Sequence, residues 1–307
     1  MAIVHHYLTY PLRRPGTDTD RYEYRRMRNA PPLRLPNNAR LGVFIMVPVE
    51  WYPLNNSNHP FVAVGGFTRA YPDIHHYTAR DYGNRVGIFR MMDVFAAYGV
   101  KPTAAMNSAI AERYPLLSDA ICAEGWEIMA SGIDMAQLHH TDLDVETEKE
   151  RVQKAISTLR KLTGQPIKGW HSPEHSESWV TPDLIAAEGV THFADWTNDE
   201  LPYKFKVKSG SLVALPAPYE LADRTILHHH VNSLADYEDQ ILSAFRLLLE
   251  ESSPERSRIF AVSFTPWIMG QPYRIAGLER ILKAVFSQSG VVALSAQQLA
   301  DAFLASQ

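Results

Sequence analysis

The stretch "LGVFIMVPVE", residues 41–50, is a mostly apolar run that ends abruptly on the acid Glu50. An apolar run of this length is typical of a strand that is buried on both faces, as in a parallel sheet. An acid directly after such a strand is expected at the strand's carboxyl end. We therefore interpret residues 41–49 as the first strand of an α/β fold and Glu50 as a candidate site residue.

Short apolar runs alternate with amphipathic stretches along the rest of the chain. The expected strands are 101–107, 126–130, 167–170, 191–195, 212–216, 258–264 and 291–295, and the expected helices are 80–99, 115–125, 144–164, 181–189, 235–251 and 274–290. Such alternation predicts parallel βαβ units. About seven units in one domain, residues 40–307, predict an irregular (β/α) barrel. No glycine-rich fingerprint follows the first strand, which disfavours a Rossmann dinucleotide site.

Residues 1–39 differ in composition from the predicted barrel. They are rich in Arg, Pro and Asn and contain no clear helical or strand pattern. We expect an extended N-terminal arm that packs on the body or on a neighbouring subunit.

Overall composition limits the classes of partner. The chain has 307 residues, 46% of them hydrophobic, and a formal net charge of -4, which gives no basic footprint for nucleic acid or membrane binding. Cys122 is the single cysteine, so no intrachain disulfide is possible. No export signal or bilayer-length apolar run is evident, and we expect a soluble, cytoplasmic protein.

Polar and aromatic residues follow the predicted strands at the end where barrels carry their chemistry. The aromatic content predicts a pocket for a compact organic substrate, and no nucleic-acid or membrane partner. Thr181 is expected to cap the helix at 181–189. The residues that we predict to bind substrate are Arg80, Asp81, Arg85, Ser131, Asp134, Trp170, Trp196, Glu220 and Trp267.

Several of these residues have a structural alternative. Glu50 is either a metal ligand or general base, or a rim carboxylate paired with a nearby arginine. Asp81 could cap the helix at 80–99 instead of binding substrate. Arg80 or Arg85 could bind a substrate carboxylate or orient Glu50.

The segment "HSPEH" places His171 and His175 four residues apart with Glu174 between them. On a helix this spacing would point both imidazoles at a metal ion. Pro173 inside the segment predicts a loop instead, so we assign these three side chains to acid–base chemistry or substrate hydrogen bonding and assign no metal ligand. The run 228–230 is expected to give one pocket histidine and two exposed ones. His139 and the histidine after it are expected on the surface.

The ordered motifs also resemble a known family. "RDYGNRVGIFRMMDVF", "GWEIMASG", "TGQPIKGWHSPEHSES", "TPDLIAAEG", "DWTNDELPY" and "GQPYR", between about residues 40 and 300, resemble the polysaccharide deacetylase-like superfamily, closest to its allantoinase-type and cyclic-imide hydrolase branch. The resemblance implies a distorted (β/α)7 barrel of the NodB type and hydrolysis of an amide, imide or acetamido C–N bond. It also implies a homo-oligomer.

The resemblance brings an expected metal site with it. In the deacetylases proper, an acid after the first strand and two histidines hold a divalent metal that polarises the carbonyl and activates water. The acid falls on Glu50, but the first histidine falls on Ser131 and the second near Met135. Thr265 stands where relatives carry a late histidine, and Ala222 where they often carry an asparagine. Serine and methionine do not replace imidazole as strong zinc ligands.

The sequence therefore predicts a hydrolase of a small, cyclic amide, imide or ureide with an altered metal site. Water would be activated by Glu50 or by a side chain of residues 171–175, and the oxyanion would be stabilised by an arginine, a histidine or backbone N–H groups. No cofactor is assigned, although zinc or manganese could bind if the histidines rebuild a site. The alternatives are a metal-dependent N-acetyl sugar deacetylase and a non-catalytic protein that binds a small molecule.

Overall fold

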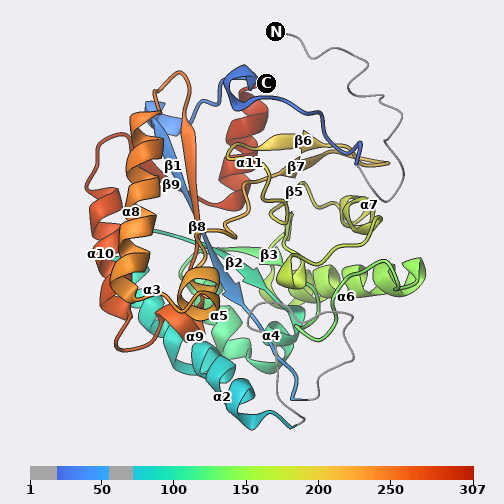
Figure 1. The fold of residues 1–307 in the computed structure, drawn as a ribbon. Coiled ribbons are helices and arrows are strands. Elements are labelled where there is room, and N and C mark those ends of the chain that lie inside the picture. The colour runs from blue at the N-terminus through green and yellow to red at the C-terminus, as the bar shows by residue number, and fades with distance from the viewer. Residues whose placement is uncertain (1–18, 55–71) are drawn as a thin grey trace.

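The computed structural model describes residues 19–54 and 72–307, and its described strands form one mostly parallel sheet (Figure 1). The hydrogen-bonded order is β6-β7-β5-β4-β3-β2-β1-β8, with β9 also paired to β1 and with β6 antiparallel to β7. The strands are β1 (Leu41–Val49), β2 (Thr103–Met106), β3 (Glu127–Ala130), β4 (Gly169–Trp170), β5 (His192–Phe193), β6 (Tyr203–Phe205), β7 (Leu212–Ala214), β8 (Arg258–Ser263) and β9 (Val291–Leu294).

Helices cover the sheet on both flanks. Figure 1 shows α3, α8 and α10 together along one flank and α6 with α7 on the other. The α-helices are α2 (Ile74–Tyr82), α3 (Ile88–Ala97), α4 (Ser108–Arg113), α5 (Pro115–Ala123), α6 (Val145–Thr163), α7 (Thr181–Ala187), α8 (Leu234–Glu250), α9 (Pro266–Met269), α10 (Ile275–Phe286) and α11 (Ala296–Ala305). Shorter turns are η1 (Met27–Asn29), η2 (Pro36–Asn38), η4 (Pro173–His175) and the π-helical η3 (Gly83–Gly87) and η5 (Arg224–His229).

Strand β1 pairs with three other strands, and every one of its residues is buried. One edge pairs with β8 along Leu41–Met46, while the other edge is shared by β9 at Leu41–Phe44 and β2 at Met46–Val49. The predicted barrel is confirmed in the form of a curled half-barrel, in which β6 and β8 end the hydrogen-bonded order. Because the strands around β1 run parallel to it, Glu50 emerges among their carboxyl ends.

The helix predicted at 80–99 is confirmed, but it is longer than expected. It begins at Ile74, and the carboxylate of Asp73 caps it by accepting the N–H of the third helical residue at 3.0 Å. Asp81 is therefore not the cap. A π-helical turn at 83–87 interrupts the helix, and such turns are frequent at functional sites.

Some short elements escaped prediction. The sequence pattern did not reveal β6, α4, α9, α11 or the two π-helical turns. Except for α11, each of these elements has six residues or fewer, and such a short segment gives little periodic signal. Thr181, expected as the N-cap of α7, is its first residue, and the cap position belongs to Val180.

Residues 19–39 of the predicted arm lie against the body. Arg21 donates to both carboxylate oxygens of Asp183 at 2.8 Å. The ring of Tyr22 packs on Trp196 with centroids 5.6 Å apart. Contact of the arm with another subunit stays a prediction. In the described ranges, no helix combines the length and the apolar character that crossing a bilayer requires.

Val231 has a backbone conformation that a β-branched residue rarely adopts. Its φ is 58°, in the left-handed region, and its side chain is 79% exposed. We expect Val231→Gly to raise the free energy of unfolding by about 1 kcal/mol, because glycine removes the Cβ strain while little packing is lost. Val145→Gly is the matched control, since Val145 is also exposed but opens helix α6, and this variant should be less stable. Chemical denaturation measures both, and a destabilised Val231→Gly would contradict the strain argument.

Candidate active site

The loop that follows β4 carries three of the predicted catalytic side chains. Pro173 opens the short turn η4, so the "HSPEH" segment is a loop and not a helix, as predicted. Glu174 and His175 both have left-handed backbones, with φ of 56° and 54°. Each such non-glycine residue costs about 1–2 kcal/mol, and strain of this kind concentrates at functional sites. With these backbone conformations, Glu174 and His175 line the pocket at the carboxyl ends of the neighbouring strands.

The end of β5 holds both imidazoles of this loop. His171 Nδ1 lies 3.0 Å from the Ala194 carbonyl oxygen and 3.0 Å from Asp195 Oδ1. His175 Nδ1 lies 3.1 Å from the Asp195 carbonyl oxygen, and the two rings meet edge to face with centroids 4.6 Å apart. Asp195 Oδ1 also accepts the N–H of Ser172 at 2.7 Å. Because carbonyl oxygens accept at Nδ1, these contacts favour a proton on Nδ1 of both rings and leave Nε2 for other chemistry.

Burial sets the charge states around these rings. Burial, followed by the charge of His171, lowers the pKa of His175 to about 4, so this imidazole is neutral at pH 7. Burial alone would raise the pKa of Asp195, but the hydrogen bond and charge of His171 outweigh it and lower that pKa. Burial and the neighbouring Asp195 raise the pKa of Glu177 well above its usual range. Protonated Glu177 therefore has a donor for Asp195, and it also accepts the Trp196 indole N–H at 2.9 Å.

A second cluster of charges lies beside the imidazoles. Arg224, the first residue of η5, donates from Nη2 to Glu50 and from Nη1 to Glu174 Oε1, the latter at 3.2 Å. The Tyr52 hydroxyl lies 3.1 Å from Glu174 Oε1 and 3.4 Å from Glu50 Oε2. Burial raises the pKa of Glu174, although the charge of Arg224 opposes this. Of the two interpretations of Glu50, the contacts match the carboxylate that is paired with an arginine. The partner is Arg224, and neither Arg80 nor Arg85.

These two clusters share a pocket at the carboxyl ends of the strands. The pocket has a volume of ≈ 40 Å³, space for a few water molecules or one small chemical group. All four residues predicted as catalytic lie around it, namely Glu50, His171, Glu174 and His175. It is lined by Met46, Pro48, Glu50, His171, Glu174, His175, Pro218, Tyr219, Ala222, Arg224, Thr225, Ser263 and Thr265.

Arg80 and Trp267 form a wall next to this pocket. The Arg80 guanidinium stacks over the Trp267 ring at 4.3 Å and lies 5.5 Å from the Tyr52 ring. His228 contacts the indole edge to face with centroids 5.0 Å apart, but all three histidines of 228–230 are exposed, so the expectation of one pocket histidine and two exposed ones is not met. His228 and His229 end η5 and His230 is its C-cap, so the run is not extended. Neither Arg80 nor Trp267 lines the pocket, but they lie beside Tyr52 and Arg224, and their substrate-binding role stays a prediction.

Three further predicted residues have local structural partners instead. Asp81 accepts a hydrogen bond from the Tyr114 hydroxyl at 2.8 Å. The Arg85 side chain is 73% exposed and lies 3.7 Å from Asp81. Asp134 accepts the N–H of Ala136 at 2.9 Å within its own turn. None of the three lines the pocket. Asp81 and Arg85 lie on the helical segment 74–97, and Asp134 lies in the irregular segment after β3, so these side chains make local contacts instead.

The remaining predicted residues lie in the core or on the surface. Trp170 is fully buried and donates from its indole N–H to Ser172 at 2.8 Å. Ser131 is buried at the end of β3. Trp196 packs between the arm and Glu177, and Glu220 is exposed. Trp170 is the last residue of β4 and is buried in the core, whereas Glu220 lies in a turn six residues after β7 and is exposed.

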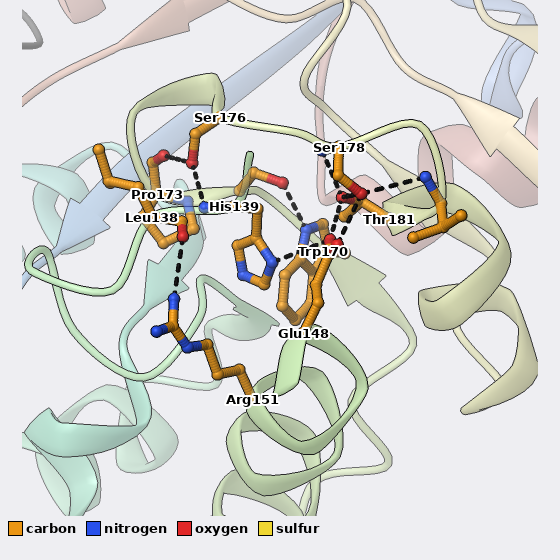
Figure 2. A network of polar contacts seen from close by, with 11 residues as sticks. Leu138, His139, Glu148, Arg151, Trp170, Pro173, Ser176, Ser178 and Thr181 are labelled. Carbon is orange, nitrogen blue, oxygen red and sulfur yellow. Dashed lines mark hydrogen bonds and ion pairs between the residues drawn. The ribbon is translucent and has the colours of Figure 1, made fainter. Parts of the chain in front are cut away.

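A buried polar network supports the loop from behind, as Figure 2 shows. Glu148 on α6 is fully buried and accepts from His139 at 3.2 Å, from Ser178 at 2.6 Å and from Thr181. The expectation that His139 lies on the surface is wrong, since its side chain is 1% exposed. Its backbone N–H also donates to the Ser176 hydroxyl at 3.1 Å. Through Glu148, the network connects α6 to the segment that holds His139, before α6, and to the segment that holds Ser178, after β4.

The donors that a family metal would need are not present at the expected place. Glu50 is neutralised by Arg224, while Ser131 and Met135 give no imidazole. A divalent ion on the same carboxylate would lie near the guanidinium. Charges of +2 and +1 about 4 Å apart repel by about 8 kcal/mol at an effective dielectric constant of 20. The residues around Glu50 therefore do not fit the metal.

One other group within residues 19–54 and 72–307 has suitable donor types. His171, His175 and Asp195 offer ligand atoms within 4.8 Å of one another. However, both Nδ1 atoms face carbonyl oxygens, and Asp195 Oδ1 already accepts two contacts. The existing hydrogen bonds make Asp195 the orienting partner of His171, an arrangement suited to proton transfer.

The sequence missed the residues that complete the site. Arg224, Tyr52 and Asp195 were not among the predicted site residues. Asp195 had a usable signal, because it ends the predicted strand at 191–195. Arg224 had none, since the π-helical turn η5 has neither strand nor α-helical periodicity.

The comparisons with known proteins agree with this architecture. Residues 74–192 match the family model described as polysaccharide deacetylase. A curated Schizosaccharomyces pombe protein named "Putative polysaccharide deacetylase" is 22% identical over 244 residues, which cover 73% of this chain and 75% of the relative. The structure of a "probable Polysaccharide deacetylase" from Pseudomonas aeruginosa has a TM-score of 0.80 at 22% identity, over 90% of this chain and 95% of that chain.

The PuuE allantoinase structure is nearly as similar, with a TM-score of 0.79 at 22% identity over 90% of this chain and 95% of that chain. At this level of identity the likeness concerns the fold. The chain has the curled α/β half-barrel fold of polysaccharide deacetylase structures, the NodB type, and the family match itself is confined to residues 74–192.

Proposed function

We propose that this protein hydrolyses a C–N bond other than a peptide bond in a small, cyclic amide, imide or ureide, without a metal ion on Glu50. The observation that carries the proposal is the convergence of the His171–Asp195 pair, Glu174 and Arg224 on one small pocket. This pocket joins a base with an orienting carboxylate, a carboxyl group of raised pKa and a fixed cation.

His171 is the base of the proposed reaction. Its Nδ1 is held by Asp195, so Nε2 is free to take a proton from water as the water oxygen attacks the substrate carbonyl. Asp195 then stabilises the imidazolium that forms. Glu174 donates the proton that the leaving nitrogen needs, and its raised pKa favours this protonated form. His171 later passes its proton to Glu174, which regenerates both groups.

The pocket supports a compact substrate over a polymer. A space of ≈ 40 Å³ between buried side chains accepts a ring carbonyl more readily than a chain of sugars. The similarity to the PuuE allantoinase fold also supports a ureide. We infer in addition that the protein acts in the cytoplasm, and that it is a homo-oligomer, as the family resemblance implies.

A substrate panel tests the proposal. Purified protein should be incubated with allantoin, hydantoin, succinimide and an N-acetylglucosamine oligomer, each with EDTA, with Zn²⁺ and with Mn²⁺. We expect ring opening of at least one cyclic compound, equally fast in EDTA. Release of acetate from the oligomer only with added metal would support the N-acetyl sugar deacetylase instead. Binding without turnover, unchanged in Glu50→Gln, would identify a non-catalytic binding protein.

A further inference from the structure

Arg224 is the cation bound to the carboxylate that the family resemblance makes a metal ligand. We propose that Arg224 replaces the divalent metal in this chain and that its guanidinium binds the carbonyl oxygen of the substrate. The second half of this proposal rests on the proposed hydrolysis of a small amide, imide or ureide.

The position of Arg224 is fixed from both sides. Its side chain is 12% exposed and is held between Glu50 and Glu174, each with a side chain that is 9% exposed. The π-helical turn η5 begins with Arg224 and brings it to the pocket wall, where His171 also lies. A guanidinium held in this way is organised before substrate arrives, which is the condition for strong electrostatic stabilisation.

The guanidinium still has donors to offer. An arginine carries five N–H bonds, and the two ion pairs are made through one atom each, Nη2 to Glu50 and Nη1 to Glu174. The Nε atom of Arg224 is buried and has no hydrogen-bond acceptor among residues 19–54 and 72–307. Burial alone would lower the pKa of Arg224, but the surrounding acids and Tyr52 raise it well above its usual range. The group therefore stays charged, and it can accept a new negative partner.

The exchange of metal for arginine also explains the departures from the family pattern. With Arg224 on Glu50, imidazoles at Ser131 and Met135 would have no cation to bind. Both positions are buried, at 2% and 6% exposure, so small or apolar side chains suit them better than histidine.

The chemistry balances with water as the only co-reactant. The water oxygen bonds to the carbonyl carbon, and its proton moves to His171. The C=O electron pair moves to the oxygen, whose negative charge is held by Arg224. When this pair returns, the C–N bond breaks and the nitrogen takes a proton from Glu174.

The kinetic experiment uses the panel compound that wild-type protein opens fastest. We expect Arg224→Gln to lower kcat by about 10²–10³-fold. Arg224→Lys should recover part of this loss, because lysine keeps the charge but not the planar fork. Arg280→Gln is the matched control, since Arg280 also makes two contacts to one carboxylate, at 2.8 and 2.6 Å, but on the surface. A wild-type kcat for Arg224→Gln would overturn the proposal.

A folding failure is separated from a catalytic one by a double variant. Arg224→Gln alone leaves the buried carboxylate of Glu50 without its cation, which destabilises the fold. Glu50→Gln combined with Arg224→Gln removes this charge and should restore the melting temperature without restoring kcat. Recovery of kcat together with the melting temperature would overturn the catalytic role of Arg224.

A metal readout tests the replacement without any substrate. Zn²⁺ is titrated by calorimetry into wild-type protein and into Glu50→Gln, and both are analysed for bound zinc after gel filtration. We expect the same zinc content in the two proteins, because Arg224 already occupies Glu50. One zinc per wild-type chain that is lost in Glu50→Gln would overturn the proposal. If no panel compound is opened, the proposed function fails, while this titration still decides whether Arg224 replaces the metal.

Discussion

Replacing His171 with glutamine is expected to lower kcat for the cyclic substrate by about 10²–10⁴-fold, the usual contribution of a general base. Glutamine keeps a donor for the Ala194 carbonyl oxygen, which lies 3.0 Å from His171 Nδ1, so the loop should keep its shape. The substituted side chain cannot take the proton of water at neutral pH. Steady-state kinetics and the melting temperature should therefore diverge, with kcat lost and folding retained.

The partner of His171 gives a second measurement of the same role. Asp195→Asn should also lower kcat strongly, because the amide cannot stabilise the imidazolium. The double variant should be hardly slower than His171→Gln, since residues that act as one unit are not additive. His230→Gln is the matched control because His230 is exposed. A kcat for His171→Gln within threefold of wild type would move the base elsewhere, and Glu50 would be the next candidate.

Glu148→Ala is expected to lower the free energy of unfolding by about 3–5 kcal/mol. The change leaves the buried donors of His139, Ser178 and Thr181 without their acceptor, which is the costly way to break a buried network. Alanine is a good helix former, so α6 itself is not weakened. Urea denaturation gives the size of the loss. Glu146→Ala on the same helix removes only an exposed 2.9 Å pair with Lys149 and should cost less than about 1 kcal/mol.

The same network predicts how stability depends on pH. Burial alone would raise the pKa of Glu148, but hydrogen bonds from His139, Ser178 and Thr181 outweigh it and lower the pKa below 4.5. A group with a lowered folded pKa stabilises the fold above its unfolded pKa and loses this contribution as the pH falls through the folded value. The difference between wild type and Glu148→Ala should therefore be full above about pH 5 and shrink on acidification. A difference that grew toward low pH would contradict this account.

Much of the fold follows from local patterns in the sequence. The run at 41–49 became β1 with the predicted bounds, because a strand buried on both faces needs an unbroken apolar run. Gly164 ends α6 in the left-handed conformation that glycine adopts without strain. The prediction of a loop at 171–175 held for the same kind of reason, since proline restricts the backbone in any context.

Only part of the candidate site could be predicted from local sequence patterns. Glu50 and the loop at 171–175 follow strand ends, and parallel strands bring their carboxyl ends together whatever lies between them. Arg224 could not be found, because its turn is π-helical and it meets Glu50 across 174 residues of chain. Likewise, nothing local distinguishes His139 from its half-buried neighbour His140, and only packing against α6 buries His139 completely.

The sequence by itself determined the order of strands and helices, the strand ends that carry polar side chains, and the absence of histidine at the positions of Ser131 and Met135. These depend on residues close together in the chain. Only the tertiary structure decided which charges meet: Arg224 with Glu50 and Glu174, and Asp195 with His171. Electrostatic partners are chosen by distance in space, and the curl of the sheet sets that distance.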